Sequence, residues 1–201
     1  MIYVVGLGPG SRDYILPKAV ETLENSDIVV GFSRALESID FININKVVVK
    51  TLSDILKIAE ENSNKKISVI ASGDPCFYGV TDYIKRNLKE HEIDIIPGLS
   101  SFQYMMSKIG KSWNGKFLGS VHGREEDFLA IVKENNTCIF LTDGKNSPKA
   151  LAEKLFKENI DCTIWVGENL SYEDEKITVG TPEEIMKKEF SSLSVFVVEE
   201  I

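Results

Sequence analysis

Two segments of the chain combine glycine with side chains that could bind or move a proton. Ser120-Val121-His122-Gly123-Arg124 places an imidazole and a guanidinium within three residues, and together they could bind an anionic group. Leu141-Thr142-Asp143-Gly144 adds a hydroxyl and a carboxylate. Either segment could equally be a structural turn, because histidine is often a structural residue and Asp-Gly often caps a helix.

Three further segments carry glycine where a strand is expected to end: GLGPG at 6–10, SGDPCFYG at 72–79 and PGLSS at 97–101. A dinucleotide fingerprint needs a third glycine and an acidic residue after the second strand. Ser11 stands in the third position, and Val30-Gly31-Phe32 brings no carboxylate. Nicotinamide or flavin binding is therefore not expected, and GLGPG could be a structural turn only.

The segment at 72–79 has both a structural and a functional interpretation. Asp74-Pro75 is typical of a helix start, with a carboxylate cap and proline in the first turn. In the functional interpretation, Gly73 lets the backbone approach a ligand while Phe77 and Tyr78 form a wall beside it. The third segment repeats this geometry, and Ser100 could likewise cap a helix or contact a ligand.

Composition narrows the class of protein. The chain has 201 residues, 43% of them hydrophobic, and a formal net charge of −8, so a nucleic-acid partner is not expected. Three cysteines without a CxxC pair and two histidines make a metal site improbable and suit reduced thiols. No apolar stretch approaches the roughly 20 residues that span a bilayer, and the N-terminus looks like a buried strand rather than a signal peptide. We therefore expect a cytoplasmic protein without a membrane contact.

The elements that must position these segments alternate between strand and helix, which predicts an α/β fold with a mainly parallel sheet. The polar stretch 109–116 is the expected joint, giving domains 1–111 and 112–201. Strands are expected at 2–5, 27–30, 46–49, 67–71 and 94–96, then at 117–121, 137–141, 162–166, 176–179 and 194–199. Helices are expected at 16–25, 53–62 (with a serine cap), 76–90, from about 100, and at 125–135, 148–158 and 182–188. The last strands are separated by only one short helix, which indicates some antiparallel pairing.

Together and in this order, GLGPG, SGDPCFYG, PGLSS, SVHGR and LTDG resemble the tetrapyrrole methylases, enzymes that use S-adenosylmethionine. Within that family, SGDP-FYG, VVGFSRAL and SVHGR are most similar to the CbiE branch, which methylates carbon 5 of cobalt-precorrin-7. The resemblance implies two α/β domains with the cofactor in a cleft between them, a homodimer, and a corrinoid precursor lying across the trough that faces the first loop.

The resemblance also assigns residues. It places S-adenosylmethionine contacts on Pro9, on Asp74 and Phe77, on Ser100 and Ser101, and on Leu141 and Thr142. Gly73 is added to these contacts because it lets the backbone approach a ligand. Arg124 is expected to orient a peripheral carboxylate of the macrocycle. His122 and Asp143 are alternative acceptors for a proton lost after methyl transfer. Because some branch members carry a fused second methyltransferase and this chain ends at Ile201, we expect carbon 5 methylation only, with a separate enzyme for carbon 15 and decarboxylation.

Two alternatives stay open. Another tetrapyrrole methylase, acting at a different ring carbon or in the diphthamide pathway, would share most of these motifs. A non-catalytic α/β module that binds a nucleotide would share the glycine loops alone.

Overall fold

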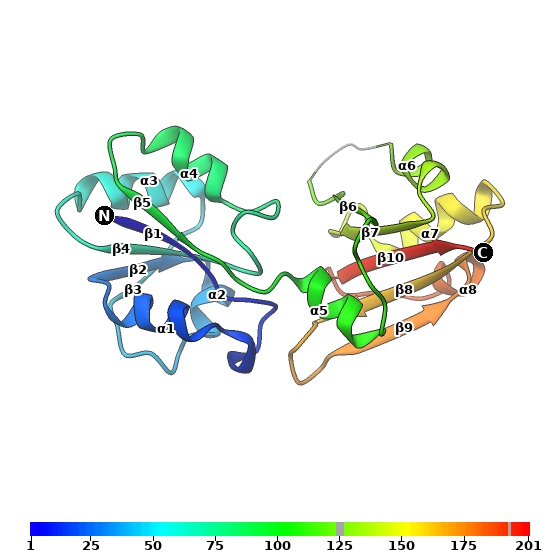
Figure 1. Ribbon diagram of the computed structural model, residues 1–201, viewed down its shortest axis with the longest axis horizontal. Coiled ribbons are helices and arrows are strands. Elements are labelled where there is room, and N and C mark those ends of the chain that lie inside the picture. The colour runs from blue at the N-terminus through cyan, green and yellow to red at the C-terminus, as the bar shows by residue number, and fades with distance from the viewer. Residues whose placement is uncertain (124–126, 193) are drawn as a thin grey trace. The chain divides into compact units, whose positions relative to one another are not determined.

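A computed structural model describes residues 1–123, 127–192 and 194–201 of the chain. It divides into two compact units, Met1–Ser100 and Ser101–Ile201. Each unit holds one five-stranded sheet with helices packed on it (Figure 1). The α/β class and the two-domain organisation predicted from the sequence are thus confirmed. None of the helices in these described ranges is long and apolar enough to cross a bilayer.

The sheet of the first unit is wholly parallel, with strand order β3-β2-β4-β1-β5. The carboxyl ends of its strands therefore lie along one edge, where open α/β sheets bind ligands. The strands are β1 (Ile2–Gly6), β2 (Ile28–Gly31), β3 (Lys46–Val48), β4 (Ile67–Ala71) and β5 (Ile93–Ile96).

Helices cover both faces of this sheet (Figure 1). On one face, side chains of β1, β2 and β4 pack with α3 (Leu52–Glu61) and α4 (Thr81–Asn87). On the other face, Val5, Val29 and Ile70 pack with α1 (Pro17–Glu24) and α2 (Ser33–Glu37). A short 3₁₀ helix, η1 (Arg12–Tyr14), lies between β1 and α1. Burial on both faces explains why these strands are short runs of β-branched residues.

Local sequence sets the helix starts, and two expectations need correction. α1 begins at Pro17, one residue after the expected start. α3 is capped by Thr51, which forms a capping box with Asp54, and not by Ser53. The helix expected at 76–90 begins only at Thr81, because residues 75–80 form turns. The five-residue helix α2 was not foreseen.

The second sheet is mixed, with order β6-β7-β10-β8-β9. β6 is parallel to β7, whereas β10 runs antiparallel to both β7 and β8, and β9 runs antiparallel to β8. The predicted antiparallel pairing is confirmed. The strands are β6 (Phe117–Ser120), β7 (Thr137–Leu141), β8 (Cys162–Glu168), β9 (Lys176–Gly180) and β10 (Ser194–Glu200).

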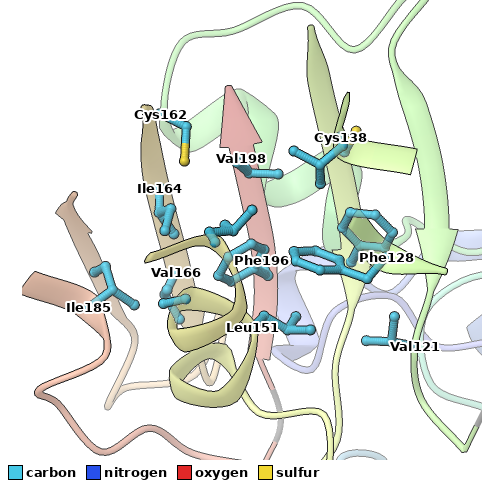
Figure 2. Close-up of a cluster of buried hydrophobic side chains, with 14 residues drawn as sticks. Val121, Phe128, Cys138, Leu151, Cys162, Ile164, Val166, Ile185, Phe196 and Val198 are labelled. Atoms are coloured by element: carbon cyan, nitrogen blue, oxygen red, sulfur yellow. The ribbon is translucent and has the colours of Figure 1, made fainter. Parts of the chain in front are cut away.

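One face of this sheet forms the largest described core cluster, shown in Figure 2. Phe140, Phe196 and Val198 on the strands meet Phe128, Leu151 and Ile185. These last three belong to α6 (Phe128–Glu134), α7 (Pro148–Lys157) and α8 (Pro182–Ile185). The rings of Phe128 and Phe140 lie 5.2 Å apart at a tilted angle, a common arrangement in aromatic cores.

The division between the units comes earlier than the expected joint after residue 111. Helix α5 (Ser101–Lys108) packs against β7 and β10 and so belongs to the second unit. The polar stretch after it is attached to the same unit. Lys111 pairs with Glu199 and lies 4.6 Å above the ring of Trp165, and Trp113 packs edge-on to Phe102. A glycine-bearing polar stretch here is a turn within a unit rather than a linker.

Candidate functional site

Three loops meet at the carboxyl edge of the first sheet, where β4, β1 and β5 are neighbours. The loops after β1 and β4 are joined by two backbone hydrogen bonds. The N–H of Gly73 donates to the carbonyl of Gly8 at 2.8 Å, and the N–H of Gly8 donates to the carbonyl of Gly73 at 3.2 Å. Both glycines have left-handed φ, +78° at Gly8 and +68° at Gly73, a conformation that favours glycine. The predicted glycine segments thus form one connected structure.

The third loop packs closely on the backbone of the other two. A Cβ atom on Gly6 would lie 2.6 Å from the nitrogen of Gly98 and 2.7 Å from the carbonyl oxygen of Gly73. A Cβ on Gly98 would overlap that same oxygen and lie 2.9 Å from the carbonyl carbon of Gly6. Neither position has room for a side chain, so the glycines bring the three backbones together.

Asp74 connects two of these loops. Its Oδ1 accepts a hydrogen bond from the backbone N–H of Cys76 at 2.8 Å, and its Oδ2 accepts one from Gly98 at 3.3 Å. The expected helix cap is wrong, because α4 begins seven positions later, at Thr81. The carboxylate instead closes a turn and links β4 to the loop after β5.

Other predicted residues of the first unit lie in the same loops. Pro9 is buried between Gly8 and Gly10, Phe77 is half-buried after Asp74, and Ser100 is 3% exposed. The structure therefore brings together Pro9, Gly73, Asp74, Phe77 and Ser100 in three adjacent loops. Ser101 follows Ser100 and begins α5.

A second group of predicted site residues lies in the loops where β6 and β7 end. Asp143 accepts hydrogen bonds from three backbone N–H groups: that of Gly123 to Oδ2 at 2.6 Å, and those of Lys145 and Asn146 to Oδ1 at 2.9 and 2.6 Å. These bonds join the loop after β7 to the loop after β6. The side chain of Asn146 adds a bond to the carbonyl of Val121 at 2.8 Å.

These bonds determine the acid–base character of Asp143. The N–H groups of Asn146 and Gly123 hold the pKa of Asp143 below its usual range, and the nearby His122 lowers it further. A carboxylate with a lowered pKa and occupied oxygens is a weak proton acceptor. The geometry favours a structural role for Asp143.

His122 differs from Asp143 in its ability to accept a proton. It is exposed, and its Nδ1 lies 3.2 Å from the carbonyl oxygen of Thr142. Because a carbonyl oxygen only accepts, Nδ1 donates in this contact, and the neutral ring then has Nε2 as its acceptor nitrogen.

Thr142 and Leu141 lie at the end of β7. Both the N–H and the hydroxyl of Thr142 donate to the carbonyl of Ser194, at 3.2 and 2.9 Å. Thr142 is buried, whereas Leu141 is half-buried. Arg124 lies outside the described residues. The linking roles of Gly98 and Asn146 were not predicted from the sequence. Asp143 followed by Gly144 was the available signal of an Asx turn, in which the carboxylate accepts from the N–H of Lys145.

Two of the three cysteines lie away from these loops. Cys138 and Cys162 lie in the core of the second unit, where burial raises the pKa of Cys138 to about 12 and that of Cys162 to about 11. Both are therefore unreactive thiols. Among the residues that the structure describes, no group of three His, Cys, Asp or Glu side chains could hold a metal ion.

The chain is similar to known proteins over almost its whole length. Residues 1–186 match the family model of the tetrapyrrole (corrin/porphyrin) methylases. A protein of Methanocaldococcus jannaschii, "probable cobalt-precorrin-7 C(5)-methyltransferase", is 39% identical over 99% of this chain and 98% of its own. A cobalt-precorrin-7 C(5)-methyltransferase of Salmonella typhimurium is 30% identical over 88% of this chain and 89% of its own. The crystal structure of a precorrin-6Y methylase (CbiE) from Archaeoglobus fulgidus has the same fold, with a TM-score of 0.80 and 24% identity over 100% of this chain and 97% of its own.

Proposed function

Because this chain belongs to the tetrapyrrole (corrin/porphyrin) methylases, we propose that it transfers a methyl group from S-adenosylmethionine to carbon 5 of cobalt-precorrin-7, without decarboxylation. The observation that carries this proposal is the near full-length similarity to the Methanocaldococcus protein, whose name states that reaction. The chain is a methyltransferase, and the step is one of cobalamin biosynthesis.

The residues present fit the proposed cofactor. The loops after β1, β4 and β5 offer backbone donors and acceptors, the Asp74 carboxylate and the Ser100 hydroxyl within one edge of the sheet. A Cβ on Gly73 would meet only the Cα of Ser100, at 3.9 Å, so the backbone here is open to close approach. Such groups suit a ligand with amino, carboxylate and hydroxyl groups. Bound S-adenosylmethionine supplies an electrophilic methyl group on a sulfonium centre.

The protein contributes mainly by positioning. Rigid loops that hold two reactants in line can lower a barrier by roughly 7–11 kcal/mol. The loops after β1, β4 and β5 have this rigidity, because each is bonded to or packed against its neighbour by backbone atoms. Pro9, Gly73, Asp74, Phe77, Ser100, Ser101, Leu141 and Thr142 are the proposed cofactor contacts.

Proton loss from carbon 5 after methylation needs an acceptor. We assign this role to His122 rather than Asp143, because the Thr142 carbonyl fixes the His122 ring with its acceptor nitrogen at Nε2. Asp143 keeps the loop that carries His122 in place through its bond to Gly123. Arg124 is proposed from its position in the sequence to bind a peripheral carboxylate of the substrate.

The decisive experiment supplies cobalt-precorrin-7 and S-adenosylmethionine with a carbon-13 methyl group. We expect NMR to show one added methyl group at carbon 5 and mass spectrometry to show no loss of carbon dioxide. Methylation at another carbon would contradict this proposal and would indicate a tetrapyrrole methylase of different specificity. A nucleotide-binding module would instead be stabilised by ATP or GTP and not by S-adenosylhomocysteine.

We also propose a cytoplasmic homodimer that works with a separate enzyme for carbon 15. Light scattering tests the assembly directly. A mass that stays near the 22.5 kDa of one chain at every working concentration contradicts the dimer.

A further inference from the structure

Tyr78 has a backbone conformation that aromatic residues rarely adopt. Its φ is +54°, in the left-handed region, where a bulky side chain is disfavoured. Glycine or asparagine would adopt this conformation more easily. A tyrosine here therefore needs a reason outside the local backbone.

The surrounding turn holds Tyr78 in this conformation. The hydroxyl of Thr81 donates to the carbonyl of Pro75 at 2.6 Å, and the N–H of Phe77 donates to the carbonyl of Asp74 at 3.2 Å. Gly79 packs directly on Pro75, where a Cβ would lie 2.7 Å from the carbonyl carbon. Strained residues held in this way are concentrated at ligand sites.

The turn presents the ring to solvent instead of burying it. Tyr78 is 40% exposed, and it lies edge-on to Phe77 with the ring centroids 5.0 Å apart. Phe77 thus supports one edge of the Tyr78 ring. Tyr78 belongs to none of the described core clusters, so we infer that its partly exposed ring is the feature that the turn maintains.

Other exposed apolar side chains share this edge of the sheet. Every exposed large hydrophobic residue of Met1–Ser100 lies at or beyond the carboxyl end of a strand: Tyr14 and Leu16 after β1, Phe32 after β2, Val48 in β3 and Tyr78 after β4. The guanidinium of Arg12, 4.1 Å above the ring of Phe41, adds a fixed cation in the loop after β1. A flat apolar ligand with carboxylates at its margin matches this combination.

We propose that Tyr78 is a substrate-positioning residue whose ring stacks on the face of the tetrapyrrole macrocycle. This inference rests on the proposed function for its ligand class, but it does not depend on which ring carbon is methylated. It gives two neighbouring residues of one turn different roles. Phe77 is a proposed cofactor contact, and Tyr78 is a proposed substrate contact.

The test uses the full chain with uroporphyrin III as a planar polycarboxylate probe and S-adenosylhomocysteine as the cofactor probe. Tyr78→Gly and Tyr78→Asn remove the ring and relieve the left-handed strain, whereas Tyr78→Phe keeps the ring. Phe156→Ala is the matched control, because Phe156 is 44% exposed on α7 of the second unit. Fluorescence titration gives the uroporphyrin affinity, calorimetry gives the cofactor affinity, and thermal unfolding gives Tm.

The proposal expects uroporphyrin affinity to fall about tenfold in Tyr78→Gly and Tyr78→Asn and to stay within about threefold in Tyr78→Phe. Cofactor affinity should not change, and Tm should be equal or higher, because strain is removed. With cobalt-precorrin-7, KM should rise more than kcat falls. A merely structural tyrosine would instead lower Tm in both strain-relieving variants.

Four results overturn the proposal. Two concern uroporphyrin: no binding by the native chain, or unchanged binding in Tyr78→Asn. The other two concern the variants without the ring: a parallel loss of cofactor affinity, or a change of assembly mass, which would make Tyr78 an interface residue. Failure of the proposed function is distinguishable from these. Methylation of a carbon other than 5, with the same dependence on Tyr78, contradicts the proposed reaction and leaves the role of Tyr78 intact.

Discussion

Asp74 and Gly98 are hydrogen-bonded across two neighbouring loops, with Oδ2 of the carboxylate 3.3 Å from the backbone nitrogen of the glycine. The same carboxylate accepts from Cys76 through its other oxygen. One side chain thus fixes the turn after β4 and the loop after β5 to each other.

We predict that Asp74→Asn weakens both the fold and the cofactor site. An amide keeps one acceptor oxygen but turns a donor group toward one of the two N–H groups, so the free energy of unfolding should fall by about 1–2 kcal/mol. The affinity for S-adenosylhomocysteine should fall about fivefold to tenfold. Chemical denaturation and calorimetry measure these effects. Asp82→Asn, an exposed change on nearby α4, serves as the control, and equal effects in both variants would contradict the linking role of Asp74.

Gly98→Ala should be among the most damaging small substitutions in the first unit. The added methyl group would overlap the carbonyl oxygen of Gly73 and crowd Gly6, and backbone atoms cannot move aside as a flexible side chain can. We expect a loss of about 1–3 kcal/mol in the free energy of unfolding. Gly144→Ala is the matched control, because a Cβ there meets nothing within 4 Å. Denaturant titration of both variants checks the prediction, and similar stabilities would refute close packing at Gly98.

Asp143 should make stability depend on pH in the acid range. Its pKa is lowered in the folded chain, chiefly by the N–H of Asn146 and then by that of Gly123. A lowered folded-state pKa means that the contribution is complete above the ordinary aspartate value of about 3.9 and is lost as pH falls through the folded value. The difference in Tm between the native chain and Asp143→Asn should therefore shrink below about pH 4. A constant difference in Tm for Asp143→Asn across this pH range would contradict the prediction.

Cofactor binding should not require a divalent ion. The proposed contacts are backbone groups, hydroxyls and one carboxylate that is already hydrogen-bonded. Calorimetry with S-adenosylhomocysteine should give the same dissociation constant with and without chelator, and the ligand should raise Tm by mass action. Strict dependence on added magnesium would remove the cofactor assignment.

The sequence predicted the strands well because hydrophobic runs bounded by glycine or polar residues are local signals. The same local signals predicted glycine loops after β1, β4 and β5, and that these loops face a ligand stays a prediction. The helix after β4 was placed too early because Asp74-Pro75 looks like a cap. Only the position of Gly98, far along the chain, shows that the carboxylate has a different partner.

Long-range contacts also account for the other differences between the predicted and the observed structure. The stretch at 109–116 looks like a linker by composition, but Lys111 pairs with Glu199 on β10. The bond from the N–H of Gly123 to Asp143 likewise joins two separate loops, whereas the N–H groups of Lys145 and Asn146 are local donors. The long-range contacts follow from where the folded chain places distant segments.

The central position of β10 has a consequence for synthesis of the chain. β10 lies between β7 and β8, yet it follows every other strand of its sheet in sequence. The first sheet is complete once β5 has emerged from the ribosome, so the first unit can fold while the second is being made. Until residues 194–200 emerge, β7 and β8 keep unpaired inner edges that can join other chains. A ribosome paused just before this strand would therefore hold a folded first unit beside an open, aggregation-prone second one.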